Sequence, residues 1–144
     1  MIPALHAPGL PAMTDVDIAL VRQLECMIAD RPQIDIPITH TLHAGMYART
    51  AILPPGALIT GALIKIPTVL VLHGDAQVFI GGESVRLTGY HVLSASAGRK
   101  QAFVAYAETH LTMVFPTNAT TVEEAEAEFT DEVALLQTRR PQEN

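Results

Sequence analysis

The sequence predicts one mainly β domain, an antiparallel sandwich or barrel, with one helix before it and one after it. The 144 residues are the length of a single domain that buries a core without covalent staples. Between residues 34 and 115, short runs rich in Val, Ile, Leu and Thr alternate with turn signals. No helical pattern separates these runs, which argues against alternating β and α units.

The first 30 residues predict an arm and a helix. Residues 1–13 carry three prolines and no periodic apolar pattern, which is typical of an extended arm. Thr14 and Asp17 then form a capping box, and the helix predicted over residues 15–29 ends before Pro32. The apolar stripe of this helix consists of Val16, Leu20, Val21, Leu24, Met27 and Ile28.

The middle of the chain predicts eight short strands. Turn signals occur at residues 54–56, 74–75, 81–82, 89 and 97–98. The strands predicted between them cover residues 47–52, 58–64, 68–72, 76–80, 83–87, 91–94, 101–106 and 111–115. Gly81-Gly82 is the clearest two-residue hairpin.

A second capping box, Thr121 with Glu124, predicts a helix over residues 122–137. Acidic residues gather at its start and Arg139-Arg140 follow its end, as the helix dipole favours. The predicted organisation is an arm over residues 1–13, a helix over 14–30, a β domain over 31–118, a helix over 119–138 and a tail over 139–144.

Composition excludes several classes of function. The net charge of −6, with no basic run longer than two residues, argues against nucleic-acid binding. The longest uncharged run, residues 50–64, is too short and too broken by Pro and Gly to span a membrane. The single cysteine, Cys26, excludes an intramolecular disulfide and a Cys-based zinc site. We therefore expect a protein made in a cytoplasm, with no membrane partner.

Surplus apolar residues predict an oligomer. The chain is 49% hydrophobic and only 17% charged, too little polar material to cover both outer faces of a sandwich. We expect a two-fold homodimer with its contact in residues 57–72. The candidate interface residues, in this segment and in the arm, are Ile2, Leu5, Leu10, Leu58, Ile59, Leu63, Leu70 and Leu72.

The segments VLVLHGDAQVFIGGE, residues 69–83, and GYHVLSASAGRKQAFVAYAET, residues 89–109, resemble the two motifs of the cupins, a jelly-roll family. The resemblance implies a cupin-like jelly-roll sandwich or barrel. In cupin enzymes it also implies a metal held by two His and a Glu from the first motif and a His from the second.

The implied metal ligands are absent from this sequence. The second motif places Gln101 at the His position and Ala105 at the Asn position. The resemblance thus predicts no metal, no cofactor, no catalytic residue and a packed interior filled by Ala62, Ile64, Val69 and Phe103. In either alignment of the first motif, the ligand positions fall among Thr60, Gly61, Ala62, Leu63, Ile64, Pro67, Thr68 and Val69.

A narrower resemblance links the chain to cupin-like proteins of tailed bacteriophages and prophages. It rests on His43, Gly45, Tyr47 and Arg49 ahead of the sheet and on the acidic helix after it. Ile64 stands where that family has a His. The resemblance implies a capsid decoration, or cementing, protein in the virion, whose partner is the major capsid protein or another virion protein.

Other residues with chemical potential form no recognised site. His73, His91 and His110 lie in different segments, and His40 and His43 are three residues apart in an extended stretch. Ser84, Ser94 and Ser96 stand in no nucleophile elbow.

The sequence leaves three candidate functions for this chain. The first is a non-enzymatic structural protein that decorates a phage capsid. The alternative is a cupin-type metal-dependent enzyme or small-molecule-binding protein, with an unusual site at His73, His91, Gln101 or His110. The third is a ligand-sensing regulator, which would need a basic reading helix that this chain lacks.

Overall fold

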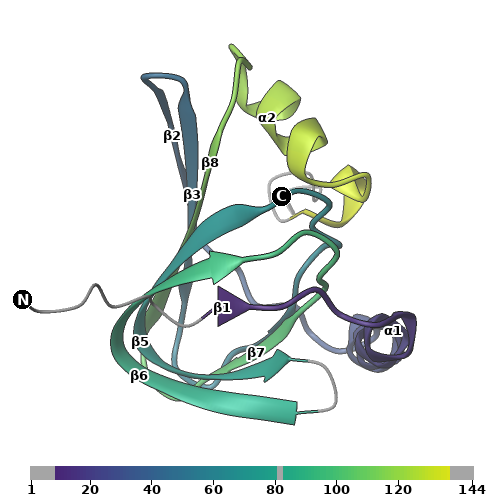
Figure 1. Ribbon diagram of the computed structural model, residues 1–144. Helices are drawn as coiled ribbons and strands as arrows, with labels where there is room; N and C mark the ends of the chain where they lie inside the picture. Colours follow the sequence, from purple (N-terminus) through teal and green to yellow (C-terminus); the bar gives the residue numbers. More distant parts are fainter. Residues whose placement is uncertain (1–8, 81–82, 137–144) are drawn as a thin grey trace, which may run out of the picture.

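The structure, a computed structural model, describes residues 9–80 and 83–136. These residues form a mainly β jelly roll with an N-terminal and a C-terminal helix, and the predicted fold class is confirmed (Figure 1). In chain order the elements are β1 Gly9–Leu10, α1 Asp15–Ala29, β2 Ile38–His43, β3 Met46–Leu53, β4 Leu58–Thr60, β5 Thr68–Ile80, β6 Glu83–Ala95, β7 Ala102–Ala105, β8 Thr109–Pro116, α2 Val122–Phe129 and the short 3-10 helix η1 Val133–Leu135.

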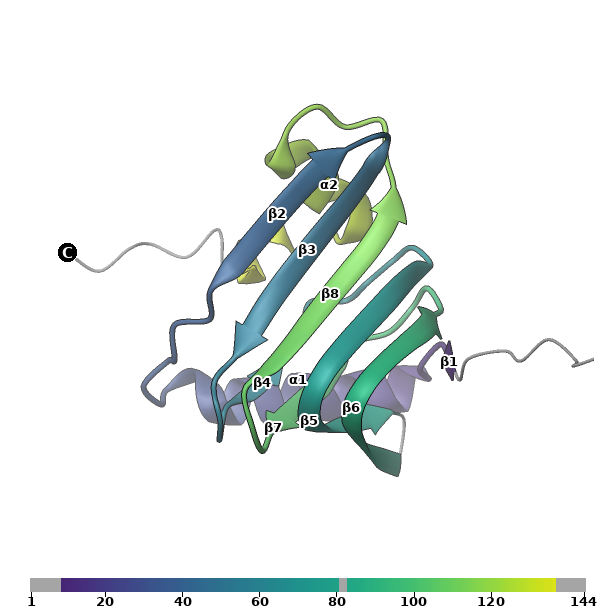
Figure 2. The same cartoon turned by 90° about the vertical axis from the view of Figure 1, so that its left-hand side faces the viewer.

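The strands form two layers that share one long hairpin. The larger layer has the order β1-β6-β5-β8-β3-β2, and its outer face is turned to the viewer in Figure 2. β5 pairs with β8 through residues 69–73 and with β7 through residues 76–79, so its two halves belong to different layers. β4 completes the smaller layer by pairing with β7. Both helices lie behind the larger layer, on its concave side (Figures 1 and 2).

Two facing glycines bend the β5–β6 hairpin. Gly74 pairs with Gly89, and their φ angles of +149° and +85° are values that other residues rarely adopt. A Cβ on Gly74 would lie 2.5 Å from Thr109 Oγ1. The sequence interpretation, which places turns at these glycines and divides each strand in two, is wrong here, because the glycines bend the ladder without interrupting it.

Two further strand predictions differ from the structure. β2 was not predicted, although it pairs with β3 along its whole length. β4 is three residues long instead of seven. After Thr60 the chain no longer forms a regular ladder with the segment around residues 99–101. It is hydrogen-bonded to that segment through Gly61 N, which donates to Gln101 O, and Ile64 N, which donates to Arg99 O. The predicted hairpin at Gly81-Gly82 lies outside the described residues.

The helix α1 has the predicted bounds but not the predicted buried face. Thr14 Oγ1 caps it by accepting a hydrogen bond of 3.2 Å from Asp17 N. Of its apolar stripe only Val21 is buried, whereas Leu20 and Met27 are 53% and 73% exposed. None of the helices in residues 9–80 and 83–136 is long and apolar enough to cross a membrane.

The helix α2 ends eight residues earlier than predicted. The backbone oxygen of Phe129 accepts a hydrogen bond from Lys65 N, and Thr130 is fully buried with extended dihedrals. The chain then turns through η1 and buries Leu136 in the core. Tertiary contacts therefore override the helical spacing of Val133 and Leu136.

The end of the predicted arm is part of the fold. Gly9 and Leu10 pair in parallel with Ser94 and Ala95 of β6, and Leu10 is 3% exposed within the core. Leu10 is therefore not an interface residue, because its own chain covers it. Ile2 and Leu5 lie outside the described residues.

Candidate functional site

A cavity of about 180 Å³ lies inside the jelly roll. It separates the two hydrophobic clusters of the core, because Leu70 and Met113 of one cluster and Phe103 and Leu111 of the other all line it. The space is partly open to the surface, as ligand-binding sites commonly are.

The cavity corrects the prediction of a packed interior. Ala62, Ile64 and Phe103 line it as expected of interior residues. Val69 instead lies on the outer side of β5 and is 44% exposed. Four polar side chains also reach the lining: Arg49, Thr60, Arg99 and Gln101.

Arg99 lines the cavity and carries a buried positive charge. The residue is 2% exposed, and its guanidinium donates to Ser96 O at 2.6 Å and to Thr68 Oγ1 at 2.7 Å. Both acceptors are neutral, and no carboxylate in the described part of the chain forms an ion pair with Arg99. Burial lowers the pKa of Arg99 to about 10, so the group remains protonated at neutral pH.

Gln101 is a second buried polar residue of the cavity lining, and its amide nitrogen is an unused hydrogen-bond donor. The residue is 5% exposed, and its Nε2 is buried without any hydrogen-bond partner. Leaving a buried donor unpaired costs about 1–3 kcal/mol, so native proteins retain few such groups. Gln101 Nε2 is the one buried side-chain polar atom without a partner in residues 9–80 and 83–136.

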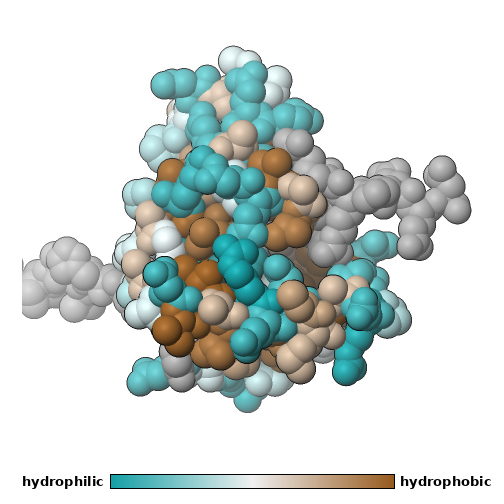
Figure 3. Space-filling model, turned by 90° about the vertical axis from the view of Figure 1, so that its right-hand side faces the viewer, coloured by the Kyte–Doolittle hydropathy of each residue, from teal (hydrophilic) through white to brown (hydrophobic). Residues whose placement is uncertain are grey.

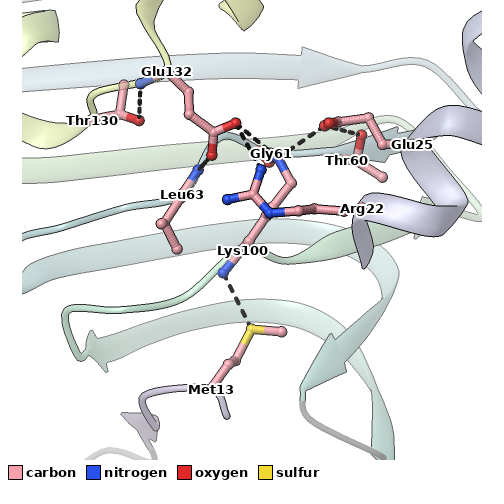
Figure 4. A network of polar contacts seen from close by, with 9 residues as sticks. All are labelled: Met13, Arg22, Glu25, Thr60, Gly61, Leu63, Lys100, Thr130 and Glu132. Carbon is pink, nitrogen blue, oxygen red and sulfur yellow. Dashed lines mark hydrogen bonds and ion pairs between the residues drawn. The ribbon is translucent and has the colours of Figure 1, made fainter. Parts of the chain in front are cut away.

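Backbone alternation explains why Arg99 and Gln101 share the cavity. In an extended segment, residues two apart point to the same side and the residue between them points to the other. The side chain of Lys100 accordingly extends toward Glu25 of α1 (Figure 4). The segment is held by backbone hydrogen bonds to Gly61 and Ile64, so Arg99 and Gln101 have a fixed direction.

Lys100 ties this segment to two other parts of the chain. Its side chain is fully buried, and Nζ lies 2.8 Å from Gly61 O, 2.9 Å from Glu25 Oε2 and 3.6 Å from Glu132 Oε2. Glu132 also contacts Arg22 of α1 at 3.3 Å. These contacts, drawn in Figure 4, join α1, the cavity segment and the C-terminal segment.

A second guanidinium, that of Arg49, is already neutralised. Its Nη1 lies 2.7 Å from Glu126 Oε2 of α2, and its guanidinium packs over the ring of Phe129. Tyr47, two residues earlier on β3, shares a hydrogen bond of 2.6 Å with His40 Nδ1. Burial raises the pKa of Tyr47 and lowers the pKa of His40, so both are neutral near pH 7.

The C-terminal segment closes one side of the cavity. Phe129, Leu135 and Leu136 line it, and Glu126, Asp131 and Glu132 pair with cations of the barrel or of α1. Figure 3 views the side of the molecule that carries both helices, where apolar side chains lie among hydrophilic ones. The cavity is thus covered by a segment that ion pairs attach to the barrel.

The lining does not fit the metal that the cupin resemblance implies. None of the described lining residues is a His, Asp, Glu or Cys, and no three such residues in this part of the chain are placed to hold a metal ion. The positive charge of Arg99, which no carboxylate among the described residues balances, disfavours a cation. The cavity therefore suits an anion rather than a metal ion.

Comparison with known proteins gives a likeness in fold at low sequence identity. No family model and no curated protein matches the chain. Solved structures that are similar to it include the following three. The Cupin_2 domain of an XRE family transcriptional regulator from Enterobacter cloacae has 15% identity, covers 58% of this chain and 99% of its own, and has a TM-score of 0.48. A protein with a double-stranded β-helix domain from Klebsiella pneumoniae has 18% identity, coverages of 62% and 80%, and a TM-score of 0.49. A cupin superfamily protein from Desulfitobacterium hafniense has 11% identity, coverages of 79% and 100%, and a TM-score of 0.48.

The histidines considered from the sequence lie away from the cavity. His73 pairs with His110 across β5 and β8, on the outer face of the larger layer. This proximity was not expected, because the two residues are 37 positions apart in the chain. The ring nitrogen Nε2 of His91 contacts Thr88 O at 2.8 Å. Of the four residues named for an unusual site, only Gln101 lines the cavity.

Several predicted interface residues belong to the core instead. Leu70 and Leu72 are 6% and 0% exposed, because even-numbered residues in this part of β5 point inward. They are therefore not contacts for another chain. Leu58 is partly exposed, while Ile59 and Leu63 are half-buried and Ile59 lines the cavity.

From the sequence, Arg99 was considered only as part of the basic pair Arg99-Lys100, in the argument against nucleic-acid binding. It was not predicted to line a cavity. The usable signal is the alternation in Arg99-Lys100-Gln101, next to a predicted strand of a barrel. Such a pattern places two polar residues inside, and a buried polar residue is informative because it is rare.

Proposed function

We propose that this chain is a small-molecule-binding protein whose ligand occupies the cavity of the jelly roll. One observation carries the proposal: Arg99, whose buried guanidinium has no carboxylate partner among the described residues, and Gln101, whose buried amide nitrogen has no described partner, line the same largely apolar cavity. Binding sites commonly combine an apolar lining with a few converging polar groups. A ligand that accepts hydrogen bonds from Arg99 and Gln101 would satisfy both groups at once.

A matched pair of substitutions on β3 tests this proposal. Ala51 lines the cavity, whereas Ala48 is on the opposite side of the strand. Thermal unfolding is followed with a panel of small aromatic and short-chain acids, amides and alcohols. We expect at least one compound to raise the Tm of the wild type and of Ala48→Met, and none to raise that of Ala51→Met. A panel that leaves the wild type unchanged, or shifts that persist in Ala51→Met, would contradict the proposal.

A second candidate is a structural subunit of a larger assembly, the function that the phage resemblance implies. Exposed apolar side chains favour it: Val16, Leu20 and Met27 on α1, and Tyr90 and Val92 on the outer face of β6. Exposed apolar side chains on two different faces of the molecule suit a subunit that contacts more than one neighbour. The capsid partner, the homodimer and the virion location stay predictions.

Light scattering at micromolar concentration tests the dimer, and co-sedimentation with undecorated phage shells tests the decoration. We expect a dimer mass and saturable binding to shells. A clean monomer that stays in the supernatant would contradict this second candidate.

A further inference from the structure

The charge of the cavity indicates the charge of its ligand. Arg49 and Arg99 both line the cavity, but Arg49 is paired with Glu126 at 2.7 Å. Of these two, only Arg99 lacks a carboxylate partner among residues 9–80 and 83–136. An isolated buried charge is costly, and one negative charge on a ligand removes that cost. A monoanion therefore balances the site, whereas a dianion brings one charge too many.

The donors of the cavity indicate the shape of the anionic group. A guanidinium has five N–H donors, and Arg99 uses its Nη1 and Nη2 groups to bond Ser96 O and Thr68 Oγ1. These two bonds fix the plane of the guanidinium and leave further N–H groups for a ligand. The amide of Gln101 supplies another donor from the same side of the segment. A planar acceptor with two oxygens, a carboxylate, matches a guanidinium fork and an adjacent amide.

The remaining lining indicates the size and polarity of the rest of the ligand. Apart from the polar residues named above, the wall consists mainly of apolar side chains such as Ile59, Leu111 and Met113. The volume is about 180 Å³. An apolar cavity of about 150 Å³ in another protein is large enough for benzene. The ligand body therefore has about six to eight non-hydrogen atoms and few polar groups.

We propose that the ligand is a small monocarboxylate with a compact apolar body, bound with its carboxylate on Arg99 and Gln101 and its body against the apolar wall. This inference rests on the proposed function, since it specifies the ligand of the same cavity. The class comprises simple aromatic acids and short-chain fatty acids, for which benzoate and hexanoate serve as probes.

Isothermal titration calorimetry with matched probes tests the ligand class. Benzoate and hexanoate are compared with benzamide and hexanamide, which have the same bodies without the charge, and with phenylphosphonate, which carries a larger charge. The protein variants are the wild type, Arg99→Met, Gln101→Met and the control Arg86→Met. Arg86 is a suitable control because it is exposed and pairs with Asp75 away from the cavity.

We expect both carboxylates to bind the wild type and Arg86→Met at least tenfold more tightly than the amides and the phosphonate. Arg99→Met should lose this preference, and Gln101→Met should weaken carboxylate binding by a smaller factor while keeping the preference.

If amides bind as well as carboxylates, the ligand class is wrong but the cavity still binds small molecules. If no probe binds and the compound panel described above also fails, both proposals are overturned. If Arg99→Met does not fold, the ligand class is tested by Gln101→Met and by the comparison of acids with amides on the wild type.

Discussion

Arg99 and Gln101 lie two residues apart on one extended segment and line the same cavity, while Lys100 between them is held on the opposite side by Glu25 and Glu132. The three residues therefore form one unit: Lys100, a fully paired buried cation, anchors the segment, and Arg99, a buried cation without a carboxylate partner in residues 9–80 and 83–136, lines the cavity. This arrangement favours a function inside the barrel, and its parts can be tested separately.

Replacing Gln101 by glutamate should supply the anion that Arg99 lacks. Gln101→Glu places a carboxylate beside a buried guanidinium, so we expect the free energy of unfolding to rise by about 1 kcal/mol or more and carboxylate binding to be lost. Urea denaturation and calorimetry measure the two effects. Gln77→Glu on the outer side of β5 is the control and should change stability by less than about 0.5 kcal/mol. A less stable Gln101→Glu protein that still binds benzoate would count against a ligand-facing Arg99.

Binding of benzoate should be independent of pH across the neutral range and should weaken on both sides of it. The pKa of Arg99 is about 10, so the guanidinium is charged up to about pH 9 and loses its proton above that. On the acid side the carboxyl group of the ligand, with a pKa of about 4, becomes neutral. Calorimetric titrations from about pH 3.5 to 10.5 measure this profile. An affinity that does not fall at the alkaline end would show that the charge of Arg99 is not used.

Removing the buried Lys100 ammonium should destabilise the fold. Lys100→Met leaves Glu25 and Glu132 without their shared cation and detaches the cavity segment from α1, which we expect to cost about 2–4 kcal/mol. The comparison variant is Lys65→Met, whose ion pair with Asp131 is largely exposed and should contribute less than about 1 kcal/mol. Urea denaturation of both variants measures the difference, and equal stabilities would contradict this role of Lys100.

The bend of the central hairpin should tolerate a side chain at only one of its two glycines. Gly74→Ala places Cβ 2.7 Å from Glu108 O, so we expect a loss of about 2 kcal/mol or more. Gly89→Ala meets no atom within 4 Å and should cost only about 1 kcal/mol, from its positive φ. Thermal denaturation separates the two variants. A reversed order would mean that the hairpin is not bent as described.

The fold was predictable from the sequence because local signals agree with the tertiary structure over much of the chain. The capping box at Thr14 and the runs of β-branched residues place α1 and most strands correctly. The errors occur where tertiary contacts decide. Gly74 and Gly89 read as turns but bend a continuous hairpin, and α2 ends at Phe129 because Lys65 N binds its backbone oxygen.

The candidate site was predictable only in part. The cupin resemblance identified the position of Gln101 and the loss of the metal ligands, but it gave no reason to expect a cavity. The hydrogen-bond partners of Arg99 are Ser96, three residues away, and Thr68, 31 residues away, and the contact with Thr68 depends on the tertiary structure. Pairing of this kind is decided by packing, not by spacing along the sequence.

A crystal structure of the protein soaked with 4-bromobenzoate tests the central claim most directly, because the anomalous signal of bromine locates the ligand without bias. We predict one bromine peak inside the cavity, with the carboxylate within hydrogen-bond distance of Arg99 and Gln101 Nε2, and no such peak in crystals of Arg99→Met. Bromine peaks confined to the protein surface, or a peak inside the cavity that is the same in Arg99→Met, would contradict the account.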